Sequence, residues 1–125
     1  MTEIKIPIAK TNLKKNEIES LLEPLKSGWL VQGPKVKEFE DSWNLFTGAK
    51  NSVAVTSCTS AMHLSLAALG FNSKDEAIVP AFTWISTANV VEHLNAKVVF
   101  CDIDLKTFNI DVNQIEEKIT PKTKA

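Results

Sequence analysis

From residue 51 onward the sequence alternates short apolar runs with segments of helical pattern, and this alternation restricts the fold more than any other feature. Runs rich in β-branched residues are predicted strands: 52–56 (SVAVT), 77–79 and 97–103 (KVVFCDI). Helices are predicted over 60–69, which Gly70 ends, and over 84–94. Successive strand–helix units predict an α/β chain with parallel-type strands. The near-continuous apolar strands agree, because parallel strands are usually covered on both faces.

Two helices are predicted before residue 51. The first covers residues 16–26, with Asn16 as its cap, Glu19 completing a capping box and Gly28 just past its end. Pro24 is expected to kink or shorten the last turn. The apolar side chains on one face of this helix are Ile18, Leu21, Leu22 and Leu25.

The second of these two helices begins at Pro34, a favoured first position, and ends before Gly48. Its apolar stripe consists of Val36, Phe39, Trp43 and Phe46. Asp111 is the predicted cap of the last helix, with Gln114 at the reciprocal position. The apolar face of that helix consists of Val112, Ile115 and Ile119.

The charge and hydropathy patterns argue against two classes of function. The formal net charge is −1, with acidic and basic residues scattered along the chain, unlike the basic surface of a nucleic-acid binder. No apolar run approaches the roughly 20 residues of a membrane span. The N-terminus MTEIKIPIAK also lacks the apolar stretch of a signal peptide. We therefore expect a cytoplasmic protein whose cysteines, Cys58 and Cys101, are buried free thiols.

Ligands of open parallel sheets bind at the carboxyl ends of the strands, where three segments of this chain meet: 56–60, 80–84 and 102–104. In the first, the hydroxyls of Thr59 and Ser60 stand at a helix start, whose free N–H groups and dipole suit a phosphate. The competing interpretation is a plain Ser/Thr helix cap. The segment is not a P-loop, because the glycines and lysine of that motif are missing.

Trp84 follows the next predicted strand at the same edge of the sheet. A large aromatic side chain there could stack on a flat cofactor ring while its indole edge stays partly wet. The alternative is a core residue at the start of a helix. A phosphate cradle on one turn and an aromatic plate on the next together suit a phosphorylated aromatic cofactor.

Five segments, in order and spacing, carry a resemblance to a known family: SGWLVQGPKVKEFE, VAVTSCTSAMHLSLAALG, DEAIVPAFTWISTANVV, AKVVFCDIDLKTFNID and IEEKITPKTKA. Together they resemble the opening half of the large domain in the DegT/DnrJ/EryC1/StrS family. That family consists of fold-type-I pyridoxal-phosphate enzymes, mostly sugar aminotransferases. The resemblance implies that residues 1–125 are the N-terminal portion of the cofactor-binding large domain, without its C-terminal part or the small domain.

The resemblance also implies roles for single residues. Thr59 and Ser60 match the family positions that hold the phosphate of pyridoxal 5′-phosphate, with Ser60 where others often carry alanine. Trp84 matches the aromatic residue that stacks on the pyridine ring. Cys58 departs from the glycine or alanine often found at its position. No metal site is predicted.

Other candidate residues are interpreted as structural. The family's pyridinium-pairing acid and Schiff-base lysine lie in later segments, so no catalytic residue is predicted within the 125 residues. Asp102 and Asp104 are then expected to be turn and cap residues. Lys122 and Lys124 are expected to be solvated charges. His63 and His93 are expected to be packing or surface residues on helices.

The complete protein is expected to transfer an amino group from an amino acid, usually glutamate in the family, to a nucleotide-linked keto sugar. The resemblance implies a homodimer, and the 125-residue chain by itself is expected to be inactive. A sugar dehydratase of the same family and a non-catalytic regulatory member remain alternatives. A plain nucleotide-binding module is a third, although the four glycines form no G-x-G-x-x-G pattern.

Overall fold

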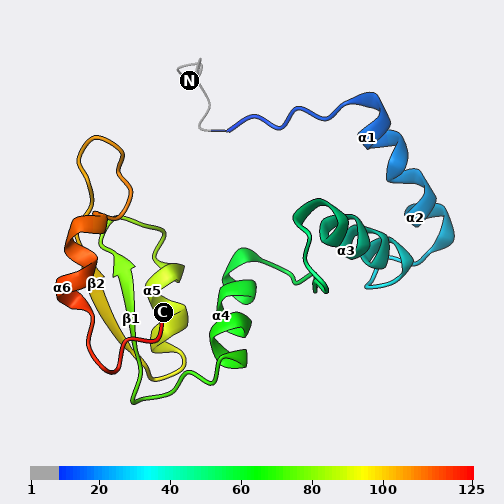
Figure 1. Cartoon of the computed structure of the whole chain (residues 1–125). Coiled ribbons are helices and arrows are strands. Elements are labelled where there is room, and N and C mark those ends of the chain that lie inside the picture. Colours follow the sequence, from blue (N-terminus) through cyan, green and yellow to red (C-terminus); the bar gives the residue numbers. More distant parts are fainter. Residues whose placement is uncertain (1–8) are drawn as a thin grey trace, which may run out of the picture. The chain divides into compact units, whose positions relative to one another are not determined.

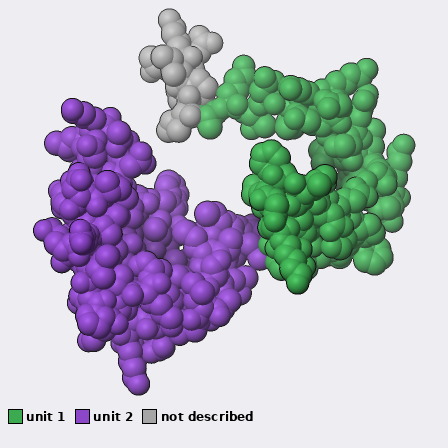
Figure 2. Space-filling model, in the orientation of Figure 1, with its two compact units in different colours: residues 1–54 green, residues 55–125 purple. Residues whose placement is uncertain are grey.

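The computed structural model describes residues 9–125. They divide into two compact units, one up to Ala54 and one from Val55 onward, which Figure 2 shows in different colours. The regular elements of the first unit are all helical, whereas the second unit is α/β. None of the helices in the described range is long and apolar enough to cross a lipid bilayer.

Two short helices, α1 (Lys15–Ser20) and α2 (Leu22–Ser27), replace the single helix predicted over residues 16–26. The interruption is at Leu21 and has its cause in Pro24. A proline ring clashes with the carbonyl four residues earlier, here that of Ser20, and removes one backbone donor. The predicted disruption by Pro24 is therefore confirmed, but it falls earlier in the chain than expected.

The helix caps at the two ends of this helical pair differ in how well they were predicted. The predicted box of Asn16 and Glu19 is wrong, because the backbone N–H of Lys14 donates to the Glu17 carboxylate at 2.6 Å. The helix thus begins one residue earlier than expected, and Glu19 instead pairs with Lys15 in solvent, at 3.7 Å. Gly28 ends α2 as predicted, with a left-handed φ of 72°.

Helix α3 (Pro34–Thr47) has the predicted bounds, with Pro34 at its start and Gly48 in the left-handed region at its end. The rings of its stripe pack on one another, because Phe39 and Phe46 each lie 6.2 Å from Trp43. None of the residues of α3 is buried. Within the first unit the aromatic stripe therefore covers itself and does not fill a core.

The strand predicted at residues 52–56 is wrong, because these residues have no regular structure. Side chains bind the backbone groups that a strand ladder would use. The Ala54 N–H donates to the Glu40 carboxylate at 2.8 Å, and its carbonyl accepts from the Gln32 amide at 3.3 Å. The Ser52 hydroxyl likewise donates to the side chain of Asn44 at 2.6 Å.

The second unit is built on two parallel strands, β1 (Glu76–Pro80) and β2 (Lys97–Cys101), as the alternating pattern predicted (Figure 1). In their register Glu76 lies opposite Lys97, and Pro80 opposite Cys101. Helix α4 (Cys58–Ala68) precedes β1, and helix α5 (Ser86–Glu92) joins the strands. The predicted helices over 60–69 and 84–94 are confirmed with shifted ends.

The segment 122–125 adds a further row of backbone bonds along the other edge of β1. Glu76 donates to the carbonyl of Lys122 at 2.8 Å and accepts from Lys124 at 2.9 Å, while Ile78 donates to Ala125 at 2.9 Å. A parallel bridge between Glu76 and Thr123 belongs to the same pairing. The parallel sheet inferred from the sequence therefore has two strands, β1 and β2, with an isolated bridge from Thr123 at its edge.

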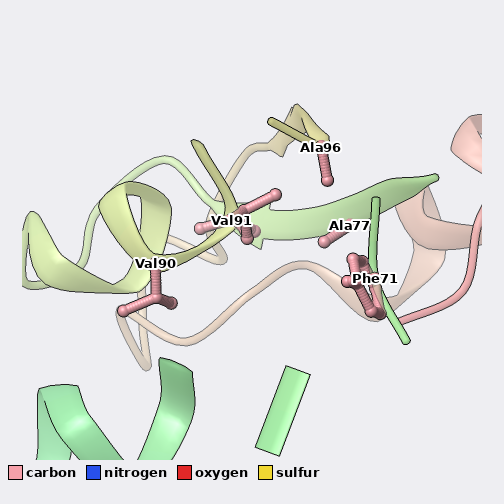
Figure 3. Close-up of a cluster of buried hydrophobic side chains, with 6 residues drawn as sticks. Phe71, Ala77, Val90, Val91 and Ala96 are labelled. Carbon is pink, nitrogen blue, oxygen red and sulfur yellow. The ribbon is translucent and has the colours of Figure 1, made fainter. Parts of the chain in front are cut away.

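A small apolar core holds the second unit together (Figure 3). Its buried side chains are Phe71, Ala77, Val79, Val90, Val91 and Ala96. Met62 and Leu66 of α4 pack against this cluster, so α4 is tied to the sheet by the same apolar contacts. Cys101 is fully buried as expected, but the expectation for Cys58 is wrong, because it is exposed at the start of α4.

Lys124 is exposed, as expected, but its ammonium also makes specific contacts that the sequence did not predict. Its ammonium donates to the Gly70 carbonyl at 3.0 Å and lies 3.3 Å from the Asp75 carboxylate. It also stands 5.4 Å from the centre of the Phe71 ring. Lys124 therefore fastens the segment 122–125 to the turn before β1, and Lys122 is also exposed as expected.

The last helix begins with the predicted cap. Asp111 accepts from the backbone N–H of Asn113 at 3.0 Å and from the Gln114 amide at 2.9 Å. The element opens as a 3-10 turn, η1 (Val112–Gln114), and continues as α6 (Ile115–Lys118). Ile119 lies beyond the helix in an extended conformation, so its predicted place on the helical face is wrong.

Candidate functional site

The first turn of α4 presents the hydroxyl groups that the sequence singled out. Ser57 is the cap, since its hydroxyl accepts from the backbone N–H of Ser60 at 3.1 Å. The Ser60 hydroxyl lies 2.9 Å from that of Ser57 and 3.2 Å from that of Thr56. Capping is therefore performed by Ser57, which leaves Thr59 and Ser60, both half-buried, for another role.

The electrostatics of this helix end suit an anion. The first backbone N–H groups of a helix have no partner within it, and the macrodipole places partial positive charge there. The first turn of α4 contains no acidic residue that would repel an anion. Added to the hydroxyls of Thr59 and Ser60, this donor set matches the chemistry of a phosphate.

Thr59 and Ser60 also line a hollow of about 360 Å³ between α4 and α5. Its other lining residues are His63, Leu64, Val90 and His93. The two imidazole rings lie 6.1 Å apart in an edge-to-face arrangement, and His63 is half-buried while His93 is exposed, as expected for packing and surface residues. The His63 Nδ1 atom is buried without a partner among residues 9–125.

Trp84 lies in the turn between β1 and α5, at the carboxyl end of β1. Its side chain is 79% exposed, so the alternative of a core residue at a helix start is wrong. Helix α5 begins two residues later, and the Trp84 carbonyl accepts from the Thr87 N–H at 2.9 Å. The indole does not line the hollow beside Thr59 and Ser60, but it is free to cover a flat ligand.

The carboxylates after β2 have the structural roles that were expected. Asp104 accepts from the backbone N–H groups of Lys106 at 2.8 Å and Thr107 at 2.9 Å. These bonds, that of Thr107 first, hold the pKa of Asp104 below its ordinary value. Asp102 accepts from the N–H of Ile103 at 2.8 Å. Residues 9–125 contain no cluster of three potential metal-ligating side chains.

Sequence reasoning missed one aromatic contact at this end of the sheet. Phe82, in the turn that carries Trp84, lies 5.9 Å from Phe108, in the loop after β2, as measured between ring centres. Phe108 has a φ of 58°, which is rare for a bulky residue. The sequence signal that could have indicated this contact is that Phe82 and Phe108 each follow a predicted strand that ends at the same edge of the sheet.

The DegT/DnrJ/EryC1/StrS aminotransferase family model matches residues 11–125. The chain belongs to this family. It is 47% identical over 120 residues to the spore coat polysaccharide biosynthesis protein SpsC of Bacillus subtilis. It is 40% identical over 119 residues to the UDP-4-amino-4-deoxy-L-arabinose–oxoglutarate aminotransferase of Shewanella sediminis. These alignments cover 96% and 95% of the chain and 31% of each relative, so the chain spans about a third of their length.

Solved structures confirm the fold of this DegT-family chain. The Streptococcus pneumoniae protein Spr1654, assigned as a sugar aminotransferase and solved in its PLP form, superposes with a TM-score of 0.87 at 38% identity. The GDP-4-keto-6-deoxy-D-mannose-3-dehydratase of E. coli, with bound hydrated PLP, gives 0.87 at 33% identity. The matches cover 95% and 98% of the chain and 30% and 33% of those structures. The α/β fold expected for part of a fold-type-I large domain is therefore confirmed.

Proposed function

We propose that residues 1–125 form the N-terminal portion of the cofactor-binding large domain of a sugar aminotransferase. Its cofactor is pyridoxal 5′-phosphate, and its reaction moves an amino group from an amino acid to a nucleotide-linked keto sugar. The observation that carries the proposal is the first turn of α4, where an acid-free helix end presents two hydroxyls in a family of such enzymes. The relatives' names support the substrate class.

Thr59 and Ser60 are the residues that would hold the cofactor phosphate. Thr59 offers its side-chain hydroxyl and, at the second position of α4, a backbone N–H that has no intrahelical acceptor. The Ser60 hydroxyl can turn from its present partners, Ser57 and Thr56, because a hydroxyl both donates and accepts. Together these residues supply charge-assisted hydrogen bonds, about twice as strong as neutral ones.

Trp84 would cover one face of the pyridine ring. Its indole is exposed and stands at the carboxyl end of β1, where ligands of parallel sheets bind. An aromatic plate fixes the plane of a flat ligand and excludes water from one face, which adds affinity without any charge. When bound, pyridoxal phosphate supplies the electron sink that allows nitrogen to leave one substrate and join another.

Proton transfer would fall to groups outside these residues. Lys124 is bound to Gly70 and Asp75, so it is not placed as a base or a covalent partner for a cofactor. Asp104 is occupied by backbone donors and does not face a pyridine nitrogen as a free acid. The 125-residue chain alone is therefore inactive in this proposal, and the protein acts as a homodimer in its complete form.

The amino donor in this proposal is glutamate. The Shewanella relative is named for oxoglutarate, the keto acid that glutamate becomes when it gives up its amino group. The sugar substrate carries a nucleotide, as the names of that relative and of the E. coli dehydratase imply for those proteins.

A matched pair of variants tests the proposal in the protein as the cell makes it. Thr59→Val keeps the shape of the side chain but removes the hydroxyl, whereas Ser65→Ala removes an exposed hydroxyl lower on the same helix, where it bonds to Ala61. The unmodified protein should convert glutamate to 2-oxoglutarate when a nucleotide-linked keto sugar is present as the amino acceptor. Thr59→Val should weaken pyridoxamine 5′-phosphate binding by roughly tenfold or more, and Ser65→Ala should not. Equal affinity in both variants would contradict the assignment of Thr59.

A sugar dehydratase is the second candidate, because the E. coli dehydratase superposes with the same TM-score of 0.87 as the aminotransferase-like structure. The products separate the two reactions. An aminotransferase incorporates nitrogen from ¹⁵N-glutamate into the sugar, whereas a dehydratase releases a deoxy sugar without nitrogen. Mass spectrometry of the sugar product decides between them.

A further inference from the structure

An aromatic contact joins two loops at the carboxyl end of the sheet. The Phe82 ring belongs to the turn after β1, and the Phe108 ring to the loop after β2. Their centres are 5.9 Å apart, within the range of interacting aromatic pairs, and their planes are inclined by 51°. Both rings are more than half exposed, so the contact is separate from the apolar core of the unit.

The loop of Phe108 holds this residue in an unfavourable backbone conformation. Its φ of 58° brings the Cβ of a bulky side chain close to the backbone, which glycine avoids. The Phe108 N–H donates to the Asp104 carbonyl at 2.8 Å, and Asp104 donates to the Asn109 carbonyl at 2.9 Å. The Asp104 carboxylate accepts in addition from Lys106 and Thr107. These bonds hold the backbone of the loop at Phe108.

Both loops begin at the carboxyl end of the sheet, where Pro80 of β1 lies opposite Cys101 of β2. An antiparallel bridge between Ile103 and Ile110 closes the loop of Phe108, which lies beyond the strand tips in Figure 1. Cys101, fully buried at the end of β2, accepts from the N–H of Ala81 at 2.7 Å. The turn that follows β1 is thus hydrogen-bonded to β2 at its first residue, Ala81, and Phe82 is the second residue of this turn.

Trp84 has few attachments of its own. Its indole is 79% exposed, and no hydrogen bond holds it within residues 9–125. The turn regains backbone support only where the Trp84 carbonyl accepts from Thr87, and where the hydroxyls of Thr83 and Thr87 lie 3.2 Å apart. The direction of the indole therefore depends on the backbone of the turn, whose middle is held by the Phe82 ring.

We propose that Phe108 is a positioning residue for Trp84. Through its contact with Phe82, it fixes the turn after β1 and so orients the indole toward the cofactor ring. This inference rests on the proposed role of Trp84 in stacking on that ring. A strained backbone maintained beside a proposed binding edge is typical of residues that position a site.

Phe108→Gly is the decisive variant, because glycine accepts a φ near 58° and the loop can keep its shape while the ring is lost. Phe108→Leu and Phe82→Leu provide independent variants that keep an apolar side chain. Leu105→Ala is the matched control, since Leu105 is 82% exposed in the same loop. All are made in the protein as the cell produces it.

Two measurements are made on each variant. The ¹⁹F resonance of 5-fluorotryptophan at position 84, assigned with Trp84→Phe, reports the indole's surroundings without cofactor. The dissociation constant of pyridoxamine 5′-phosphate, which has no aldehyde to form a covalent link, reports stacking. We expect the Phe108 and Phe82 variants to shift or broaden the Trp84 signal and to weaken binding by roughly three- to tenfold. Leu105→Ala should change neither.

Two other outcomes would overturn the proposals separately. An unchanged Trp84 resonance in Phe108→Gly and Phe108→Leu, even with a lowered melting temperature, would give Phe108 a structural role only. Unchanged pyridoxamine 5′-phosphate affinity in Trp84→Ala, which removes the aromatic ring altogether, with the ¹⁹F shift still dependent on Phe108, would instead remove the stacking role of Trp84.

Discussion

The hydroxyl of Thr120 donates to the buried carboxylate of Glu76 at 2.7 Å, and the Lys97 ammonium lies 3.0 Å from the other oxygen of the same carboxylate. Glu76 begins β1, Lys97 begins β2, and Thr120 precedes the segment that pairs with the far edge of β1. One side chain therefore joins the three extended segments at their starts.

Because of Glu76, the free energy of unfolding of this unit should decrease as the pH falls. The Thr120 hydroxyl, and then the Lys97 ammonium, lower the pKa of Glu76 in the folded state. Because this pKa is lower when folded than when unfolded, the stabilisation is complete above the unfolded pKa and is lost as pH falls through the folded pKa. Glu76→Gln should lower the denaturation midpoint at neutral pH and flatten its acid dependence. The exposed Glu92→Gln is the control, and the same acid dependence in both variants would disprove the role of Glu76.

Lys124 is expected to contribute measurably to stability. Lys124→Ala removes the hydrogen bond to Gly70, the ion pair with Asp75 and the cation–π contact with Phe71. We expect a loss of about 1–2 kcal/mol in the free energy of unfolding, measured by urea denaturation. Lys122→Ala, at an exposed position of the same segment, should cost less than about 0.5 kcal/mol. Equal losses would mean that Lys124 is only a solvated charge.

Gly33 is expected to reject any side chain, because of Trp29. A Cβ at Gly33 would lie 2.2 Å from the indole nitrogen, which donates to the Gln32 carbonyl at 2.8 Å. The backbone at Gly33 is extended, so the cause is steric and not conformational. Gly33→Ala should displace the exposed indole, change the tryptophan fluorescence, and cost about 0.5–1.5 kcal/mol through the lost hydrogen bond to Gln32. In a Trp29→Ala background the same substitution should be nearly neutral. A full cost without the indole would refute this explanation.

The elements that could be predicted from the sequence are those defined by local chemistry. Pro34 and Gly48 mark the ends of α3 because each favours one backbone conformation at that place. Two of the predicted apolar runs form β1 and β2, which pair in parallel. Residues 52–56 have the same strand-like composition, but side chains of Glu40 and Gln32 bind the Ala54 backbone, and composition alone does not reveal such bonds.

The candidate site could be predicted only in part, for a similar reason. The hydroxyls at the start of α4 follow from a local motif, and the structure adds that Ser57 is the one that caps. The exposure of Trp84 and Cys58 depends on what surrounds them, which hydropathy does not report. The contact between Phe82 and Phe108 depends on two loops far apart in the chain and on a left-handed phenylalanine.

Ser57 and Thr59 allow the capping and phosphate-binding roles of this turn to be measured separately. Ser57→Ala removes the acceptor for the Ser60 N–H and should cost about 1 kcal/mol of stability. It leaves the N–H groups free, so pyridoxamine 5′-phosphate affinity should change little. Thr59→Val should have the opposite profile, with stability kept and affinity lost. Urea denaturation and ligand titration of both variants give the comparison. If Ser57→Ala also loses most of its affinity, the cap itself orients the phosphate site and the two roles are inseparable.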